Sequence, residues 1–219
     1  MLPFKHPSNI LVAGPSQCGK TQFVKRVLFE NLIQPPPSRI IYFYAEKQHV
    51  FEELRAVFPI IEFIQGFKSD IYDCLSPTDK NLVIIDDLMS ETKDSEELAK
   101  LFTKGSHHRN ATIIMIVQNL FAKGNAMRTV NLNSHYVVVF KNPRDSGQIS
   151  ILAHQMQSRK RKFIEEAFED ATSKPHEYLL LDFCQSTPEE FRVRSKVFKD
   201  DDMEVYVPKG LKVIENSSI

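Results

Sequence analysis

Tryptophan is absent from the 219 residues, and cysteine is scarce, being confined to Cys18, Cys74 and Cys184. The three cysteines lie far apart and form no Cys-x-x-Cys pair, which indicates a reducing compartment and argues against a structural zinc site. No apolar run reaches the roughly 18 residues that suggest a membrane-spanning helix. The N-terminal residues lack the pattern of a signal peptide. We therefore expect a protein that is not secreted and does not associate with membranes.

Neither sign of charge is in excess, because 28 Lys and Arg residues balance 28 Asp and Glu residues. The balance hides a basic stretch at 104–162, in which Asp145 is the only acid. Such a stretch either presents one face to a polyanion or is neutralised by acidic neighbours in the fold, and the sequence leaves both readings open. Its basic residues are Lys104, Arg109, Lys123, Arg128, Lys141, Arg144, Arg159, Lys160, Arg161 and Lys162.

Apolar runs of strand type alternate with amphipathic segments of helical period along most of the chain. Strands are predicted at 9–14, 39–44, 60–66, 81–87, 111–119, 135–140, 177–183 and 191–198. Helices are predicted at 21–33, 49–58, 95–105, 146–155 and 162–171. The prolines of 34–37 are expected to stop the first helix, and Gly105 is expected to cap the third.

This alternation predicts an α/β fold with a mostly parallel sheet, helices on both faces and an antiparallel C-terminal edge. The composition, with 42% hydrophobic and 26% charged residues, is that of a globular protein. The length suits one large domain, which we place at 1–199, followed by a loose polar tail at 200–219.

A phosphate-binding motif, GxxxxGK[ST], lies between the first predicted strand and the first predicted helix. Its glycines allow backbone N–H groups to surround phosphate oxygens, and the following helix N-terminus favours the same negative charge. Lys20 reaches the β- and γ-phosphates, and the Thr21 hydroxyl ligates Mg²⁺. We interpret Cys18 as a small filler, the alternative being a thiol whose modification blocks ATP. The motif comprises Gly14, Pro15, Ser16, Gln17, Cys18, Gly19, Lys20 and Thr21.

Polar residues at the ends of two later strands suit the chemistry of a bound nucleotide. Asp86 ends a buried strand and is predicted to hold Mg²⁺, while the adjacent Asp87 is predicted to activate water. Gln118 ends another strand and is placed to contact the γ-phosphate or the water. Arg109 precedes that same strand, so it is expected at the far end of the sheet and able to reach only a neighbouring subunit's nucleotide. Each assignment has an alternative. The two acids could mark a simple strand boundary, Gln118 could be a polar strand cap, and Arg109 could be a surface arginine.

The segments GPSQCGKT, VIIDDLM, LFTKGSHHRNATIIMIVQNLF and LNSHYVVVFKNPRD together resemble the HerA/FtsK superfamily of P-loop ATPases. Within it the chain is most similar to poxvirus-type genome-packaging ATPases, above all those of Maverick/Polinton elements and adintovirus-like viruses. The resemblance implies a RecA-like core of the additional-strand type. It also implies a hexameric or pentameric ring that drives double-stranded DNA into a capsid, with capsid or portal proteins as partners, in the nucleus or a cytoplasmic virus factory.

The family's roles carry over to Lys20 and Thr21 for phosphate and Mg²⁺, Asp86 for Mg²⁺, Asp87 for water activation, and Gln118 as sensor. Arg109 is the candidate for an arginine that acts on the next subunit. Many superfamily members have glutamate where this chain has Asp87, so direct base catalysis here needs a closer water.

Basic side chains of the 104–162 stretch are candidates to contact DNA phosphates without reading bases. They are Lys123, Arg128, Lys141 and Arg144. The run SRKRK at 158–162 is read as a DNA contact, a nuclear-import signal or a solvated helix start. Two other functions stay open: an ATP-binding switch or DNA-assembly protein with little turnover, and another P-loop enzyme such as a kinase, although no arginine-rich lid is evident.

Overall fold

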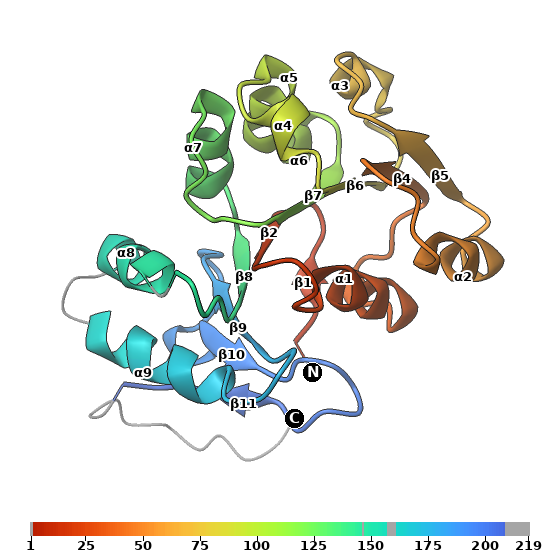
Figure 1. The fold of residues 1–219 in the computed structure, drawn as a ribbon. Helices are drawn as coiled ribbons and strands as arrows, with labels where there is room; N and C mark the ends of the chain where they lie inside the picture. The colour runs from red at the N-terminus through yellow and green to blue at the C-terminus, as the bar shows by residue number, and fades with distance from the viewer. Residues whose placement is uncertain (1, 146, 157–160, 209–219) are drawn as a thin grey trace.

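The computed structural model describes residues 2–145, 147–156 and 161–208, and within them nine strands form one twisted sheet (Figure 1). The strands coincide with the apolar runs of the sequence, apart from the last one, and most of them bury side chains on both of their faces. They are β2 (Asn9–Ala13), β4 (Arg39–Tyr44), β5 (Ile61–Gln65), β6 (Asn81–Asp86), β7 (Ala111–Val117), β8 (Tyr136–Phe140), β9 (Tyr178–Asp182), β10 (Val193–Ser195) and β11 (Glu204–Val205).

The sheet order is β11-β10-β9-β8-β2-β7-β6-β4-β5. The six strands from β8 to β5 run parallel, while β9, β10 and β11 add an antiparallel edge, as predicted. Strand β7 lies between β2, which precedes the phosphate motif, and β6, which ends in Asp86. This inserted strand is the arrangement expected of an additional-strand fold.

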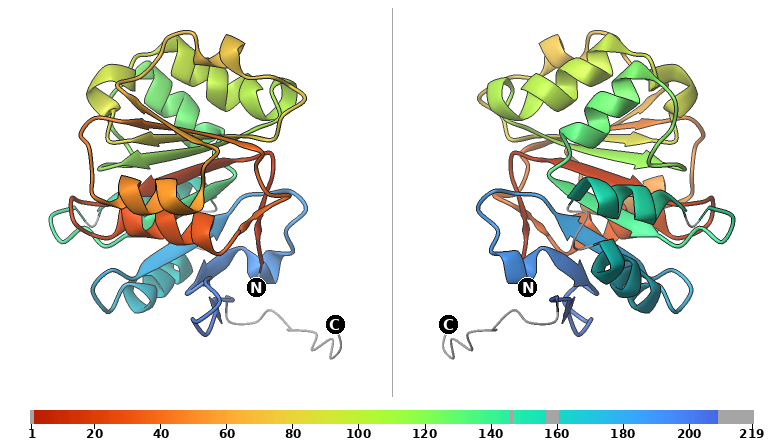
Figure 2. Two further views of the ribbon diagram at one scale, coloured as in Figure 1. Left: turned by 90° about the vertical axis from the view of Figure 1, so that its right-hand side faces the viewer. Right: turned by 90° about the vertical axis from the view of Figure 1, so that its left-hand side faces the viewer.

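Helices cover both faces of the sheet (Figure 2). The buried side chains of α1 and α2 belong to one hydrophobic cluster, and those of α3, α5, α7, α8 and α9 belong to the other. The sheet therefore separates two cores, each closed by amphipathic helices. The helices are α1 (Lys20–Phe29), α2 (Val50–Val57), α3 (Ile71–Cys74), α4 (Met89–Thr92), α5 (Glu96–Lys100), α6 (Ser106–His108), α7 (Asn125–Leu132), α8 (Gly147–Met156) and α9 (Arg161–Ala171).

The first helix is shorter than predicted. It ends at Phe29, whereas the prediction extended it to Ile33. Asn31 adopts a left-handed conformation with φ of 51°, which turns the chain before any proline is reached. Ile33 then enters β3 (Ile33–Gln34), which pairs in parallel with β1 (Phe4–Lys5). The apolar period at Ile33 thus reflects burial in a small second sheet and not a continued helix.

Gly105 does not cap a helix, contrary to the prediction. Its φ is −60°, and the helix continues through a π-helical segment, Leu101–Gly105, into α6. A side chain added at Gly105 would contact Leu101 and Ile113, so the residue lies where the helix packs against β7. The turn comes instead at Asn110, whose φ is 46°.

Part of the expected polar tail belongs to the sheet. Glu204–Val205 form β11 and pair with Arg194 and Ser195 of β10, while 209–219 lie outside the described residues. In the described part of the chain, no helix combines the length and the apolar character needed to cross a membrane.

Candidate functional site

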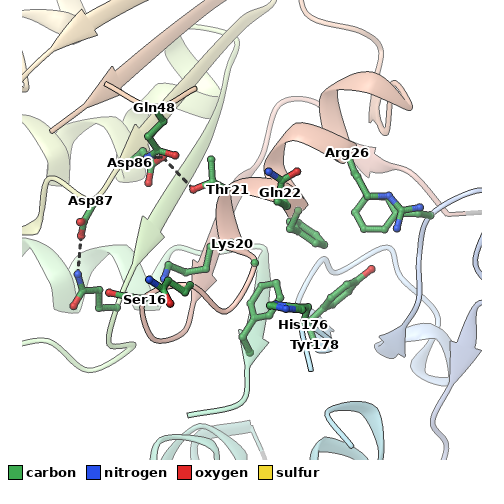
Figure 3. A pocket seen from close by; sticks show the side chains of 16 residues that line it. Ser16, Lys20, Thr21, Gln22, Arg26, Gln48, Asp86, Asp87, His176 and Tyr178 are labelled. Atoms are coloured by element: carbon green, nitrogen blue, oxygen red, sulfur yellow. Dashed lines mark hydrogen bonds between the residues drawn. The ribbon is translucent and has the colours of Figure 1, made fainter. Parts of the chain in front are cut away.

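Three segments that are far apart in the sequence meet at the carboxyl edge of the parallel strands. Val117 pairs with Ala13, and Asp86 pairs with Ile116, so the phosphate motif, the two acids and Gln118 follow neighbouring strands. They line a pocket of about 670 Å³ (Figure 3). Its lining is Ser16, Gln17, Gly19, Lys20, Thr21, Gln22, Phe23, Arg26, Gln48, Asp86, Asp87, Gln118, Phe140, His176, Tyr178 and Phe198.

The phosphate loop requires glycine at two positions for different reasons. A Cβ on Gly14 would lie 2.7 Å from both Cys18 Sγ and Phe140 Cβ, so a side chain there has no room. Gly19 has φ of 111°, which side-chain-bearing residues rarely adopt. Lys20 Nζ donates to the carbonyl oxygens of Gly14 and Pro15, both at 2.7 Å, and is thereby held across the loop.

Asp86 is the most enclosed acid of the site, with 3% of its surface exposed. Its Oδ2 accepts hydrogen bonds from Tyr42 Oη at 2.8 Å, Gln48 Nε2 at 3.2 Å and Thr21 Oγ1 at 3.4 Å. Burial raises the pKa of the Asp86 carboxyl, and the Tyr42 hydrogen bond opposes that rise.

The Thr21 hydroxyl and the Asp86 carboxylate suit a magnesium ion. Both groups offer oxygen ligands to a metal, and they already lie in contact. Such an arrangement is expected of a site in which one or two protein oxygens share the ion with waters and phosphates.

Asp87 and Gln118 are brought together directly. Gln118 Nε2 donates to Asp87 Oδ1 at 3.0 Å, and both side chains are exposed toward the pocket. Asp87 has φ of 55°, a left-handed conformation that turns its side chain away from the direction that Asp86 takes (Figure 3). Two adjacent acids therefore occupy different environments, one buried and one open.

The other end of the pocket is aromatic and was not predicted. The Phe140 and Tyr178 rings are 5.6 Å apart, and the Arg26 guanidinium lies 3.9 Å from the centre of the Phe198 ring. His176 Nδ1 donates to the Cys18 carbonyl oxygen at 3.2 Å. Apart from Arg26, these residues come from segments more than 100 residues beyond the phosphate loop. The sequence pattern of those segments indicated only core strands or polar surface.

Cys18 fits the filler interpretation. Its side chain is half-buried, and burial raises the pKa of its thiol despite the nearby Lys20 ammonium, whose Nζ is 4.0 Å from Sγ. A thiol with a raised pKa has little of the reactive thiolate at neutral pH.

Arg109 is not part of this pocket. It precedes β7 whereas Gln118 follows it, so the two residues lie at opposite ends of one strand. Arg109 Nη2 is 3.2 Å from Asp73 Oδ1, and its guanidinium lies 4.6 Å from the centre of the Tyr72 ring. The fold thus separates Arg109 from the other predicted catalytic residues of the same chain.

The basic stretch divides into paired and unpaired members. Arg161 and Lys162 pair with Glu165 and Glu166, whereas Ser158, Arg159 and Lys160 of the SRKRK run lie outside the described residues. Five side chains are exposed and lie within 4.0 Å of no described acidic group; they are Lys104, Lys123, Arg128, Lys141 and Arg144. Acidic neighbours thus neutralise one part of the stretch, and the interpretation of the exposed part as a face for a polyanion stays a prediction.

No protein-family model matches the sequence, and no curated protein sequence matches it. Solved structures do match. B204, the DNA-packaging ATPase from Sulfolobus turreted icosahedral virus, is 11% identical, with a TM-score of 0.56 over 95% of this chain and 99% of that one. The genome-packaging NTPase B204 from Sulfolobus turreted icosahedral virus 2, in complex with ATP-γ-S, is also 11% identical. Its TM-score is 0.56, and the match covers 92% of this chain and 97% of that one.

At this identity the likeness concerns the fold. It covers nearly the whole of each chain. The chain has the mixed α/β fold of the RecA-like P-loop NTPases.

Proposed function

We propose that this chain is a Mg²⁺-dependent ATPase that drives double-stranded DNA of a viral or Polinton-like genome into a capsid. The observation that carries the proposal is the single pocket that joins the phosphate loop, the buried Asp86 and the Asp87–Gln118 pair. The nucleotide-binding neighbour of the same fold and the motif resemblance support it.

The phosphates of ATP bind in the loop 14–21, where backbone N–H groups and the start of α1 face them. Lys20 exchanges its two carbonyl partners for phosphate oxygens, which replaces neutral acceptors by charged ones. Thr21 and Asp86 would hold Mg²⁺, and the bound ion would neutralise negative charge on the phosphates.

Hydrolysis is assigned to the Asp87–Gln118 pair. Asp87 accepts the proton of the attacking water as the water's oxygen bonds to the γ-phosphorus and the bond to the β-phosphate oxygen breaks. The Gln118 amide occupies Oδ1, which leaves Oδ2 for the water. Gln118 directly follows β7, and from this position the same amide can respond to the γ-phosphate.

The aromatic end of the pocket is assigned to the nucleoside. Gln22 and Arg26 on α1 face His176 and Tyr178 across the pocket, which offers flat apolar and cationic surfaces to a purine ring (Figure 3).

A ring supplies the charge that the pocket lacks. Among the described lining residues the one arginine is Arg26, which lies at the aromatic end and not beside Asp87. We assign the transition-state arginine to Arg109 of a neighbouring subunit, in a hexamer or pentamer built from head-to-tail contacts. We assign contacts with DNA phosphates to Lys123, Arg128, Lys141 and Arg144. Capsid or portal proteins are the proposed partners of the ring.

The test is ATP hydrolysis with Mg²⁺, with and without double-stranded DNA, at two salt concentrations, for wild type and Lys20→Ala. We expect DNA to raise the rate, salt to weaken that effect, and Lys20→Ala to abolish turnover. Nucleotide binding without hydrolysis under any condition would favour a switch instead. Phosphoryl transfer to a small acceptor would favour a kinase. Either result contradicts the packaging proposal.

A further inference from the structure

Two residues that the proposed chemistry does not use, Tyr42 and Gln48, contact the carboxylate assigned to the metal. Both donate to Asp86 Oδ2, at 2.8 Å and 3.2 Å, and they arrive from different directions. Tyr42 lies on β4, the strand beside β6, whereas Gln48 lies in the segment between β4 and α2 and forms part of the pocket wall.

The Tyr42 hydroxyl has little freedom to turn elsewhere. The side chain is fully buried, and its ring packs 5.1 Å from Phe51 and 5.4 Å from Phe63. Its hydrogen bond to Asp86 is also the shortest of the three. A buried hydroxyl held in this way fixes the position of the oxygen that accepts from it.

Gln48 differs from Tyr42 because it is half-buried and lines the pocket. Its amide holds the same carboxylate oxygen from the open side. The third donor, Thr21, makes the longest of the three bonds, at 3.4 Å. Thr21 is therefore the donor most readily released, and its hydroxyl is the one assigned to the metal.

We propose that Tyr42 and Gln48 are positioning residues that hold the Asp86 carboxylate in place when Thr21 turns its hydroxyl to a divalent cation bound with the nucleotide. This inference rests on the proposed ATPase function. Neither residue touches the reacting atoms. Their role is to keep Asp86 oriented after its third donor leaves, as residues that orient a ligating carboxylate do in other metal sites.

The test separates metal-dependent from metal-independent binding. The affinity of a fluorescent, non-hydrolysable ATP analogue is measured in EDTA and along a Mg²⁺ titration, for wild type, Tyr42→Phe and Gln48→Ala. Thermal unfolding of each variant is recorded as well. For both variants we expect the affinity in EDTA to match wild type and the Mg²⁺ concentration at half-saturation to rise about tenfold.

Two matched controls lie nearby. Tyr44→Phe removes a hydroxyl from the same strand, one that bonds to no described group. Gln65→Ala removes an amide that donates to the Ala45 carbonyl oxygen instead of to Asp86. Both controls should titrate with Mg²⁺ like wild type.

The possible outcomes are distinct. If Tyr42→Phe and Gln48→Ala both titrate like wild type, the positioning role is wrong. If both lose affinity equally in EDTA and in Mg²⁺, they shape the pocket in general and the inference is again wrong. If Tyr42→Phe unfolds early, Gln48→Ala decides alone. If wild type binds nucleotide with no dependence on Mg²⁺, the proposed function itself fails.

Discussion

Gln118 Nε2 and Asp87 Oδ1 lie 3.0 Å apart, although 31 residues separate them in the chain. The contact exists because β7 is inserted beside β6, so that both strands deliver their ends to the same edge of the sheet. The pair joins a candidate base to a candidate γ-phosphate sensor. A change in one side chain is therefore expected to alter the position of the other.

Asp87→Asn should abolish turnover while preserving nucleotide binding. Asparagine keeps the shape and the contact with Gln118 but removes the proton acceptor, so we expect a loss of about 10²–10⁴-fold in the hydrolysis rate. Phosphate release and analogue binding are measured on the same sample. A variant that retains most of the wild-type rate would show that Asp87 is not the base.

Arg109→Ala should impair wild-type subunits when the two are mixed. If each arginine acts on the next subunit's nucleotide, activity falls more steeply than the fraction of wild type in the mixture, because one variant subunit disables a neighbour's site. The measurement is the hydrolysis rate across mixing ratios. Arg39→Ala is the matched control, since Arg39 begins β4 and also pairs with a surface acid, Glu62. A linear decline with Arg109→Ala would assign the arginine a local structural role.

Gly14→Ala should both destabilise the fold and weaken nucleotide binding. The added methyl group would lie 2.7 Å from Cys18 Sγ and Phe140 Cβ, and overpacking of this kind costs about 1–3 kcal/mol. Chemical denaturation and analogue binding are the measurements. Gly147→Ala is the control, because among the described atoms its added carbon would meet only Asp145 Oδ1, at 3.4 Å, on the exposed start of α8. Equal stability of the two variants would contradict the packing argument.

Stability should fall in mild acid partly through His135. Burial, followed by the nearby His107, lowers the pKa of His135, whose Nδ1 accepts a hydrogen bond from the Asn9 backbone N–H. The unfolded chain therefore binds this proton more readily than the folded one, so the free energy of unfolding decreases as the pH falls below the ordinary histidine value of about 6.5.

His135→Asn should flatten this pH dependence, because an amide oxygen can accept the same hydrogen bond without titrating. Urea unfolding at pH 7.5 and 5.5 measures the effect. His49→Asn, at an exposed position, is the control and should leave the slope unchanged. An identical slope for wild type and His135→Asn would exclude this histidine as a source of acid sensitivity.

Much of the architecture follows from local pattern. The runs RIIYFY, NLVIID and ATIIMIV become β4, β6 and β7 because residues that bury both faces of a strand leave a continuous apolar signal. The phosphate loop is equally local, since its glycines, Lys20 and Thr21 act within eight residues. Two local predictions were wrong. Ile33 was assigned to the first helix and Gly105 to a helix cap, but both residues are explained by burial against neighbouring elements.

What the sequence determined by itself was eight of the nine strands of the large sheet, the phosphate loop and the two acids at the end of β6, because each is specified by neighbours within one element. Only the tertiary structure decided that Tyr42 and Gln48 contact Asp86, that His176 contacts the loop at Cys18, and that Arg109 pairs with Asp73. These contacts join residues between 36 and 158 positions apart. They depend on strand order and register, which come from the packing of the whole sheet and leave no periodic trace in any single segment.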